Sequence, residues 1–92
     1  MKLTVEFLGV SRRLAQTPEC QTEVPDRATF RDVLREIATR FPALQGAVID
    51  PTTHALLPEF MLNIGGRQAV TDLDAPAQDG QRLLLMFLEA GG

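Results

Sequence analysis

The chain has 92 residues, of which 45% are hydrophobic and 23% are charged, with a formal net charge of −3. This length and composition predict one small globular domain, and the acidic balance argues against electrostatic binding of nucleic acid or of an anionic membrane. No apolar run approaches the ~20 residues that span a membrane, and the first residues lack a signal-peptide pattern. We therefore expect a cytoplasmic protein.

Two short strands are predicted at the beginning of the chain. Apolar side chains occupy alternate positions in residues 2–8, a pattern typical of a half-buried strand that Gly9 ends. A second short alternating segment covers residues 20–24. The polar stretch 11–19 between them predicts a loop, so we expect the two strands to form a hairpin.

The strongest pattern in the sequence is that of an amphipathic helix over residues 30–41. Thr29 lies at the N-cap position and Asp32 follows three residues later, which predicts a carboxylate variant of the capping box. Pro42 ends the helix. The apolar side chains recur at helical spacing and form one stripe, which we expect to pack on a sheet: Phe30, Val33, Leu34, Ile37, Ala38 and Phe41.

Two further strands are predicted after a long connection. Residues 43–49 predict an irregular helical turn, and the sequence Asp-Pro-Thr-Thr at 50–53 is typical of a turn. Residues 59–64 then have the composition of a strand. Gly65-Gly66 predicts a two-residue hairpin that leads into a strand over residues 67–70.

The last strand, residues 81–88, predicts a binding surface. It ends in six consecutive apolar residues, so both of its faces are apolar and it belongs in the centre of the sheet. One helix covers only one face of a small sheet. We therefore expect Leu84, Met86, Leu88 or their neighbours to form an exposed apolar patch that binds a partner, together with the following Glu89 and Ala90.

The order of these elements predicts an α+β fold of the β-grasp, or ubiquitin-like, type. Residues 1–92 would form a single domain: a mixed sheet of about five strands, one main helix packed on one face, and a flexible C-terminal tail at 89–92. The crossover rule places the first strand parallel to the last.

The sequence finishes with Gly91-Gly92, directly after the predicted central strand. Without a Cβ atom, glycines can extend through a channel that is too narrow for any other residue. The carboxylate of Gly92 is unhindered, but a free carboxylate is a poor electrophile. A partner enzyme would first have to convert it to an acyl-adenylate with ATP. The alternative is a pair of glycines in a frayed tail.

Several segments, in this order, resemble those of one family, the ubiquitin-like sulfur carriers. This family includes the small subunit of molybdopterin synthase and the carriers of the thiamine and cysteine pathways. The length of residues 44–60 is more similar to the cysteine-pathway carrier and to carriers shared with tRNA thiolation, whereas Glu89-Ala90 departs from the proline that many members have before the glycines. The similar segments are Phe7 to Arg12, Thr29-Phe30 with the helix, Leu62-Asn63, Leu73 to Leu83 and Gly91-Gly92.

The resemblance implies a sulfur carrier rather than an enzyme, although it is compatible with the small subunit of one. An adenylating enzyme of the ubiquitin-activating type would use ATP to activate the Gly92 carboxylate, and a persulfide donor would supply the sulfur for a C-terminal thiocarboxylate. The acceptor would be a synthase, such as the large subunit of molybdopterin synthase, a cysteine synthase, or an enzyme of thiamine synthesis or tRNA thiolation. No cofactor bound to the carrier is implied.

Two alternatives stay open beside the sulfur carrier. The chain could be a ubiquitin-like modifier that is joined through Gly92 to lysines of other proteins, since this requires the same activation step. It could also be a β-grasp interaction module in which the glycines are incidental.

Scarce residue types limit other chemistry. Cys20 is the only cysteine, so the chain has no intrachain disulfide and no thiolate metal cluster. We expect Cys20 to be a small buried hydrophobic residue, with a reactive thiol as the alternative. His54 is the only histidine and Ser11 the only serine, and a Ser-His-Asp triad is a remote alternative to a loop histidine. No metal site is expected.

The remaining charged residues favour structural roles. The carboxylates at positions 72, 74 and 79 are predicted to be turn acids rather than cation ligands, because their spacing fits no EF-hand. Arginines at positions 31, 35 and 40 lie on the polar side of the predicted helix among acidic residues, which indicates a solvated face. Docking of an acidic partner there is the alternative.

Overall fold

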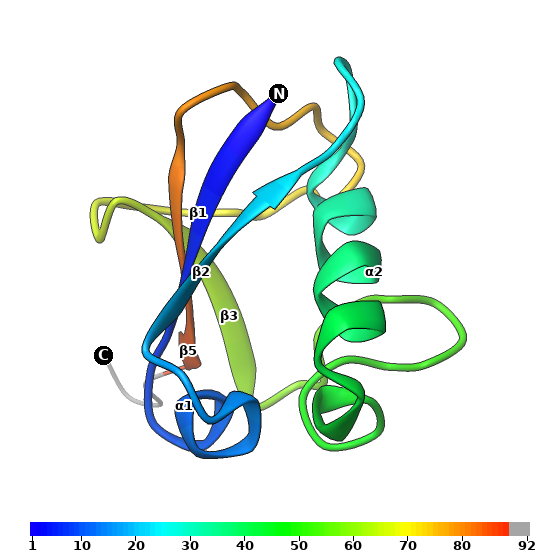
Figure 1. Ribbon diagram of the computed structural model, residues 1–92, viewed down its shortest axis with the longest axis vertical. Coiled ribbons are helices and arrows are strands. Elements are labelled where there is room, and N and C mark those ends of the chain that lie inside the picture. Colours follow the sequence, from blue (N-terminus) through cyan, green and yellow to red (C-terminus); the bar gives the residue numbers. More distant parts are fainter. Residues whose placement is uncertain (89–92) are drawn as a thin grey trace.

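The chain folds into a five-stranded mixed sheet with one long helix packed on one of its faces (Figure 1). This computed structural model describes residues 1–88, and the predicted tail 89–92 lies outside the described residues. The strands are β1 (Lys2–Phe7), β2 (Glu19–Glu23), β3 (Phe60–Ile64), β4 (Gln68–Ala69) and β5 (Arg82–Phe87), and the helices are α1 (Val10–Ala15), α2 (Phe30–Arg40) and the short 3-10 helix η1 (Pro42–Leu44).

The order of the strands across the sheet is β2-β1-β5-β3-β4. Strands β1 and β5 are parallel, with Thr4 beside Arg82, and every other pair is antiparallel. This arrangement confirms the predicted β-grasp fold, the parallel pairing of the first and last strands, and the central position of the last strand.

The long helix α2 begins where the sequence predicts it. The hydroxyl of Thr29 accepts a hydrogen bond from the backbone N–H of Asp32 at 3.1 Å, and the Asp32 carboxylate accepts one from the backbone N–H of Thr29 at 2.9 Å. Both groups of the capping box are thus present. The helix ends at Arg40, one residue before the predicted end, and Pro42 begins the 3-10 helix η1.

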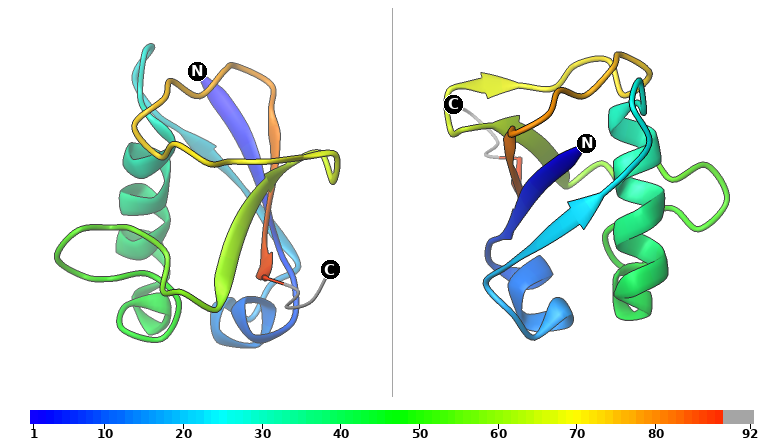
Figure 2. Two further views of the ribbon diagram at one scale, coloured as in Figure 1. Left: turned by 180° about the vertical axis from the view of Figure 1, so that it is seen from behind. Right: turned by 45° about the horizontal axis from the view of Figure 1, so that its top comes forward.

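The core lies between the sheet and α2, and Figure 2 shows that the helix covers only one side of the sheet. From α2, the stripe buries Phe30, Val33, Leu34, Ile37 and Ala38. From the sheet, Leu3, Val5, Phe7, Leu62, Leu83 and Leu85 are buried, and the segment after α2 adds Leu44, Val48 and Ile49. Non-polar burial of this kind is the main term that stabilises the fold.

The prediction that residues 11–19 form only a loop was wrong, because the chain makes the short helix α1 there. Gly9 precedes the helix with a φ of 61°, a left-handed backbone conformation that glycine adopts without strain. The helix buries Ser11 and Ala15 and packs at the end of the sheet. A six-residue helix is marginal on its own, so its tertiary contacts stabilise it. Strand β2 begins one residue before its predicted position.

The hairpin between β3 and β4 is also longer than predicted. Ile64 pairs with Gln68, so the connection has three residues, Gly65, Gly66 and Arg67. Both glycines have positive φ, as the turn requires. The backbone N–H of Gly65 donates to the carbonyl of Arg82 at 2.8 Å, which extends the pairing of this segment with β5 beyond the end of β3. Strand β4 is correspondingly reduced to two residues.

The connection between η1 and β3 extends past α2, as its green trace shows in Figure 1. Its turn is confirmed, since the Asp50 carboxylate accepts hydrogen bonds from the backbone N–H groups of Thr52 and Thr53 at 2.8 and 3.0 Å. These two bonds lower the pKa of Asp50. Throughout residues 1–88, no helix has the length and apolar character needed to cross a membrane.

Candidate functional site: the outer face and the end of strand β5

Strand β5 separates its apolar side chains between two environments. Leu83 and Leu85 are 0% exposed and face α2. Leu84 and Met86 alternate with them, so they lie on the opposite face of the sheet, where they are half-buried. Leu88 continues this alternation just beyond the strand and is 55% exposed. The structure therefore places the three predicted patch residues on the face that the helix does not cover.

Strand β3 enlarges this apolar surface. Met61 is the register partner of Met86, and paired residues of neighbouring strands present their side chains to the same face. We use the name outer patch for Met61, Leu84, Met86 and Leu88. Met61 and Leu88 also line a depression of about 360 Å³ that extends around the edge of β3 to Val70 and Leu73. The outer patch is thus a continuous surface over β3 and β5 rather than a feature of one strand.

Asn63 interrupts the apolar character of this face. It pairs with Leu84 on one side and with Ala69 on the other. Its carboxamide oxygen is buried and has no hydrogen-bond partner within residues 1–88. A buried polar atom without a partner carries a desolvation cost. The outer face therefore holds one polar side chain whose hydrogen-bonding capacity the described residues do not fully use.

The other half of the same face is charged. The guanidinium of Arg82 donates to Glu6 at 3.1 Å and to Glu19 at 2.8 Å, which ties β5 to β1 and β2. Both hydrogen bonds raise the pKa of Arg82, and the one to Glu19 has the larger effect. Exposed ion pairs of this kind contribute little to stability because water screens them. Their main effect is to divide the outer face into a charged half over β1 and β2 and an apolar half over β3 and β5.

The C-terminal end of β5 is held on both sides. The backbone N–H of Leu88 donates to the Glu59 carbonyl at 2.7 Å. On the side of β1, the buried hydroxyl of Ser11 lies 2.9 Å from the carbonyl oxygens of both Leu8 and Leu85, and it accepts a hydrogen bond from the Leu8 N–H at 3.1 Å. The strand is therefore anchored as far as the residue that precedes the predicted tail.

Phe87 lies at this same end of the strand and was not predicted as a site residue. Its ring is 45% exposed and stacks on Phe60 with centroids 4.9 Å apart. Phe87 also lines a groove of about 670 Å³ between the end of β5 and α1. Gly9, Arg12 and Arg13 line the same groove, so two exposed cationic side chains flank the place where the chain leaves the sheet.

Sequence reasoning missed the contribution of α1 to this end of the molecule. Val10 and Leu14 are spaced four residues apart and both pack against the core, which is a weak helical signal within a polar stretch. The burial of Ser11 had no signal in the sequence, because its partner is the backbone of Leu85, seventy-four positions along the chain. Met61 and Phe87 were likewise identifiable only from strand pairing.

The structure gives no support to a Ser-His-Asp triad of Ser11 and His54, because the Ser11 hydroxyl has only backbone hydrogen-bond partners within residues 1–88. The hydroxyl of Ser11 makes the backbone contacts described above, and His54 lies in the loop after the Asp50 turn, where its backbone N–H donates to the Asp50 carbonyl.

Partial burial raises the pKa of the Cys20 thiol, although the charge of Arg40 opposes this shift. A raised pKa reduces the fraction of reactive thiolate.

The predicted turn acids accept hydrogen bonds within the fold. The carboxylate of Asp72 accepts from the Asp74 N–H at 2.9 Å, and that of Asp79 accepts from the Lys2 N–H at 2.7 Å. Among residues 1–88, no group of three or more His, Cys, Asp or Glu side chains is arranged to hold a metal ion.

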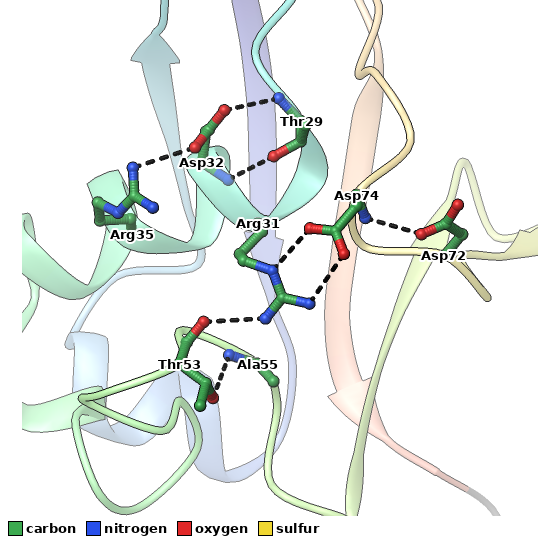
Figure 3. Close-up of polar contacts among 8 residues, drawn as sticks. All are labelled: Thr29, Arg31, Asp32, Arg35, Thr53, Ala55, Asp72 and Asp74. Carbon is green, nitrogen blue, oxygen red and sulfur yellow. Dashed lines mark hydrogen bonds and ion pairs between the residues drawn. The ribbon is translucent and has the colours of Figure 1, made fainter.

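The polar face of α2 is used to fix neighbouring segments (Figure 3). The guanidinium of Arg31 donates to Asp74 at 2.8 and 3.4 Å and to the Thr53 carbonyl at 2.9 Å, so it joins the helix to two loops. This contact lowers the pKa of Asp74. Arg35 pairs with Asp32 at 3.0 Å, and Arg40 donates to the backbone carbonyl of Gln21. All three arginines thus have partners within the domain.

The four predicted site residues Glu89, Ala90, Gly91 and Gly92 lie outside the described residues. The structure locates the point from which they continue, which is Leu88, the last residue of the outer patch and the neighbour of Phe87 in the groove. The predicted roles of these four residues and of the outer patch stay predictions.

Comparisons with known proteins agree with the fold. No family model and no curated protein matches the sequence. Among solved structures, small archaeal modifier protein 1 from Haloferax volcanii is similar with a TM-score of 0.84 and 21% identity, covering 100% of both chains. The resemblance that the sequence indicates is therefore confirmed at the level of the fold.

Two other solved structures have the same fold. One is a protein from Pyrococcus furiosus designated molybdopterin converting factor subunit 1, with a TM-score of 0.71 and 24% identity over 92% of this chain and 94% of that chain. The other is Urm1 from Trypanosoma brucei, with a TM-score of 0.72 and 21% identity over 99% of this chain and 95% of that chain.

Proposed function

We propose that this protein is a ubiquitin-like sulfur carrier whose Gly92 carboxylate is activated by a partner enzyme and converted to a thiocarboxylate. The observation that carries the proposal is the position of the outer patch. It lies at the C-terminal end of a rigidly held central strand, directly before the residues that lead to Gly91-Gly92. A partner that grips the patch would hold the start of these four residues at a defined place.

The names of the similar structures support the same proposal. One is designated molybdopterin converting factor subunit 1, and another is small archaeal modifier protein 1. The proposed partners are therefore an adenylating enzyme of the ubiquitin-activating type, a persulfide sulfur donor, and a sulfur-accepting synthase. The acceptor class includes the large subunit of molybdopterin synthase, a cysteine synthase, and enzymes of thiamine synthesis or tRNA thiolation.

The proposed chemistry takes place at the Gly92 carbonyl carbon. A carboxylate oxygen attacks the α-phosphorus of ATP, and pyrophosphate leaves to give an acyl-adenylate. A persulfide then attacks the acyl carbon and AMP leaves, which gives an acyl disulfide. A thiol of the enzyme then attacks the donor's own sulfur, the one not bonded to the acyl carbon. The S–S bond breaks, the thiocarboxylate leaves, and a new disulfide forms between the attacking sulfur and the donor sulfur. The carrier supplies the acyl group and the docking surface, and the partner supplies ATP binding and catalysis.

Intact-mass measurement tests this proposal. With ATP, the adenylating enzyme and a persulfide donor, the mass should rise by the difference between sulfur and oxygen, located at Gly92. Deleting Gly92 should abolish the shift, and it removes no residue of the core described above. Gly91→Val should block it nearly as well, because a β-branched side chain cannot follow a channel shaped for bare backbone.

Cys20→Ser is the matched control, because it removes the only thiol of the chain and should leave the mass shift unchanged. A shift that maps to Cys20 would contradict the carrier proposal. So would an unchanged mass with several adenylating enzymes, and this second result would favour a β-grasp interaction module.

A ubiquitin-like modifier is the second candidate, favoured by the similarity to small archaeal modifier protein 1. It shares the activation step but transfers the acyl group to lysine amines of other proteins. The two candidates are distinguished by the product: a thiocarboxylate on the free protein for the carrier, or a Gly92 isopeptide on lysines of cell proteins for the modifier.

A further inference from the structure

The cationic residues of this chain are unusually unreactive toward acyl groups. Eight of its nine basic residues are arginine, and Lys2 is the single lysine. A guanidinium stays protonated in proteins and offers no free lone pair, whereas a lysine ammonium can lose its proton and become a nucleophile. The difference matters for a protein whose own terminus is to carry an activated acyl group.

The structure places Lys2 at one end of the sheet and Leu88, from which the chain continues to Gly92, at the opposite end. Lys2 begins β1 at the end marked N in Figure 1, whereas β5 finishes at the opposite end beside α1. Because β1 and β5 run parallel with Thr4 beside Arg82, Lys2 and Leu88 are separated along the strands by eight residue steps, or about 26 Å at ~3.3 Å per step.

This separation exceeds the reach of the segment after Leu88. Four residues span at most ~14 Å when fully extended, and a lysine stem adds about 6 Å. An acyl group at Gly92 therefore cannot contact the Lys2 amine of the same molecule. The amino group of Met1 lies at the same distant end, where it donates to the Val24 carbonyl at 2.7 Å.

Arginine side chains occupy the region that the acyl group can reach. Arg12 and Arg13 are exposed on α1 and line the groove that also contains Phe87. Gly92 follows Phe87 by five residues, a maximum span of ~17 Å. Every cationic side chain of this groove is thus within range of the Gly92 carbonyl. The one thiol of the chain, that of Cys20, is partly buried.

We propose that Arg12 and Arg13 protect the activated Gly92 acyl group from capture by the chain itself, because they supply positive charge at the chain exit without an acylable amine. This inference rests on the proposed function, since it presupposes an activated terminus. A lysine at either position would react by aminolysis. Its neutral amine would attack the acyl carbon, a C–N bond would form, AMP or a thiolate would leave, and the amine proton would pass to water.

The test uses the full chain with a C-terminal thioester at Gly92, made by thiolysis of an intein fusion. This route needs no activating enzyme, so its outcome is independent of whether such an enzyme accepts the protein. Arg12→Lys and Arg13→Lys are compared with the wild type and with Arg27→Lys. Arg27 is also an exposed arginine, but it follows β2 at the end of the sheet where Glu23 pairs with Lys2, beyond the reach calculated above.

The thioesters are incubated in dilute solution at mildly alkaline pH and followed by intact mass. The wild type and Arg27→Lys should only hydrolyse. Arg12→Lys or Arg13→Lys should lose the thioester about tenfold faster, because the tethered amine has a high effective concentration. The internal amide formed by the lysine variant should be lighter than the hydrolysed acid by the mass of one water molecule. Peptide mapping should locate this amide at the substituted position.

Either of two results would overturn the proposal. In one, both groove variants hydrolyse at the wild-type rate without an internal amide. In the other, the wild type itself forms an internal amide. Lysine and arginine have similar helix propensities, so α1 should be retained, and circular dichroism checks this.

Discussion

Adjacent positions on β5 provide a sharp test of the outer patch. Leu85 is 0% exposed and faces α2, whereas Met86 lies on the opposite face beside Met61. Leu85→Glu and Met86→Glu introduce the same charge one residue apart. The first should destroy the fold, and the second should preserve it while weakening the binding of the adenylating enzyme.

The magnitudes follow from the two environments. Leu85→Glu loses about 1.5–3 kcal/mol of apolar burial, and an unpaired carboxylate in the core costs several kcal/mol more. A domain of this size has a total stability of about 5–14 kcal/mol, so most of it would be lost. The carboxylate of Met86→Glu can remain in water, and a surface change of this kind alters stability by less than about 1 kcal/mol.

Met86→Glu should weaken binding of the adenylating enzyme strongly, although it changes stability little. Loss of an apolar anchor near the centre of an interface costs at least about 2 kcal/mol, which is a factor of about 30 in affinity. ATP–pyrophosphate exchange by the adenylating enzyme measures this directly. Met86→Glu should raise the KM for the carrier about 30-fold with little change in kcat, because the lost contact is the same in the ground and transition states.

Gln21→Glu is the matched control for charge. It adds the same negative charge to the same face, on the exposed residue of β2 that pairs with Thr4, outside the apolar half. It should leave both stability and exchange near wild type. Wild-type exchange with Met86→Glu would refute the outer patch as the docking surface. Urea denaturation showing that Met86→Glu unfolds like Leu85→Glu would refute the assignment of the two faces.

Two further predictions concern α2. Leu34→Asp or Ile37→Asp should abolish cooperative thermal unfolding, because each places a carboxylate in the core; a melt close to wild type would contradict the packing of the helix on the sheet. The capping box should make stability sensitive to acid. Hydrogen bonding from the Thr29 backbone lowers the pKa of Asp32, so its contribution is complete above the unfolded-state pKa and is lost as pH falls through the folded-state pKa. Asp32→Ala should therefore lose less stability than wild type between neutral and acidic pH in urea titrations, and equal losses would argue against this role.

Local patterns in the sequence were sufficient for most of the fold. The apolar stripe with its capping box defines α2 to within one residue, because helical period and cap chemistry depend only on neighbouring residues. The six-residue apolar run at the end of β5 indicates a central strand, and the order of elements then leads to the parallel pairing of β1 with β5.

The same apolar run could not show which of its residues face the core. When every position is apolar, the alternation of a strand does not show which side chains belong to which face. Only the packing of α2 against Leu83 and Leu85 assigns Leu84 and Met86 to the outer face. The pairing of Met61 with Met86 depends likewise on strand register, which is set across the sheet rather than along the chain.

The residues that surround the C-terminal end of β5 could be identified only from the tertiary structure. Helix α1 has too few residues to be stable alone, and its tertiary contacts stabilise it, among them the bond from Ser11 to the Leu85 backbone at the end of β5. That contact brings Arg12 and Arg13 beside Phe87. Residues more than seventy positions apart become neighbours there, and a contact over such a separation leaves no periodic trace in the local sequence.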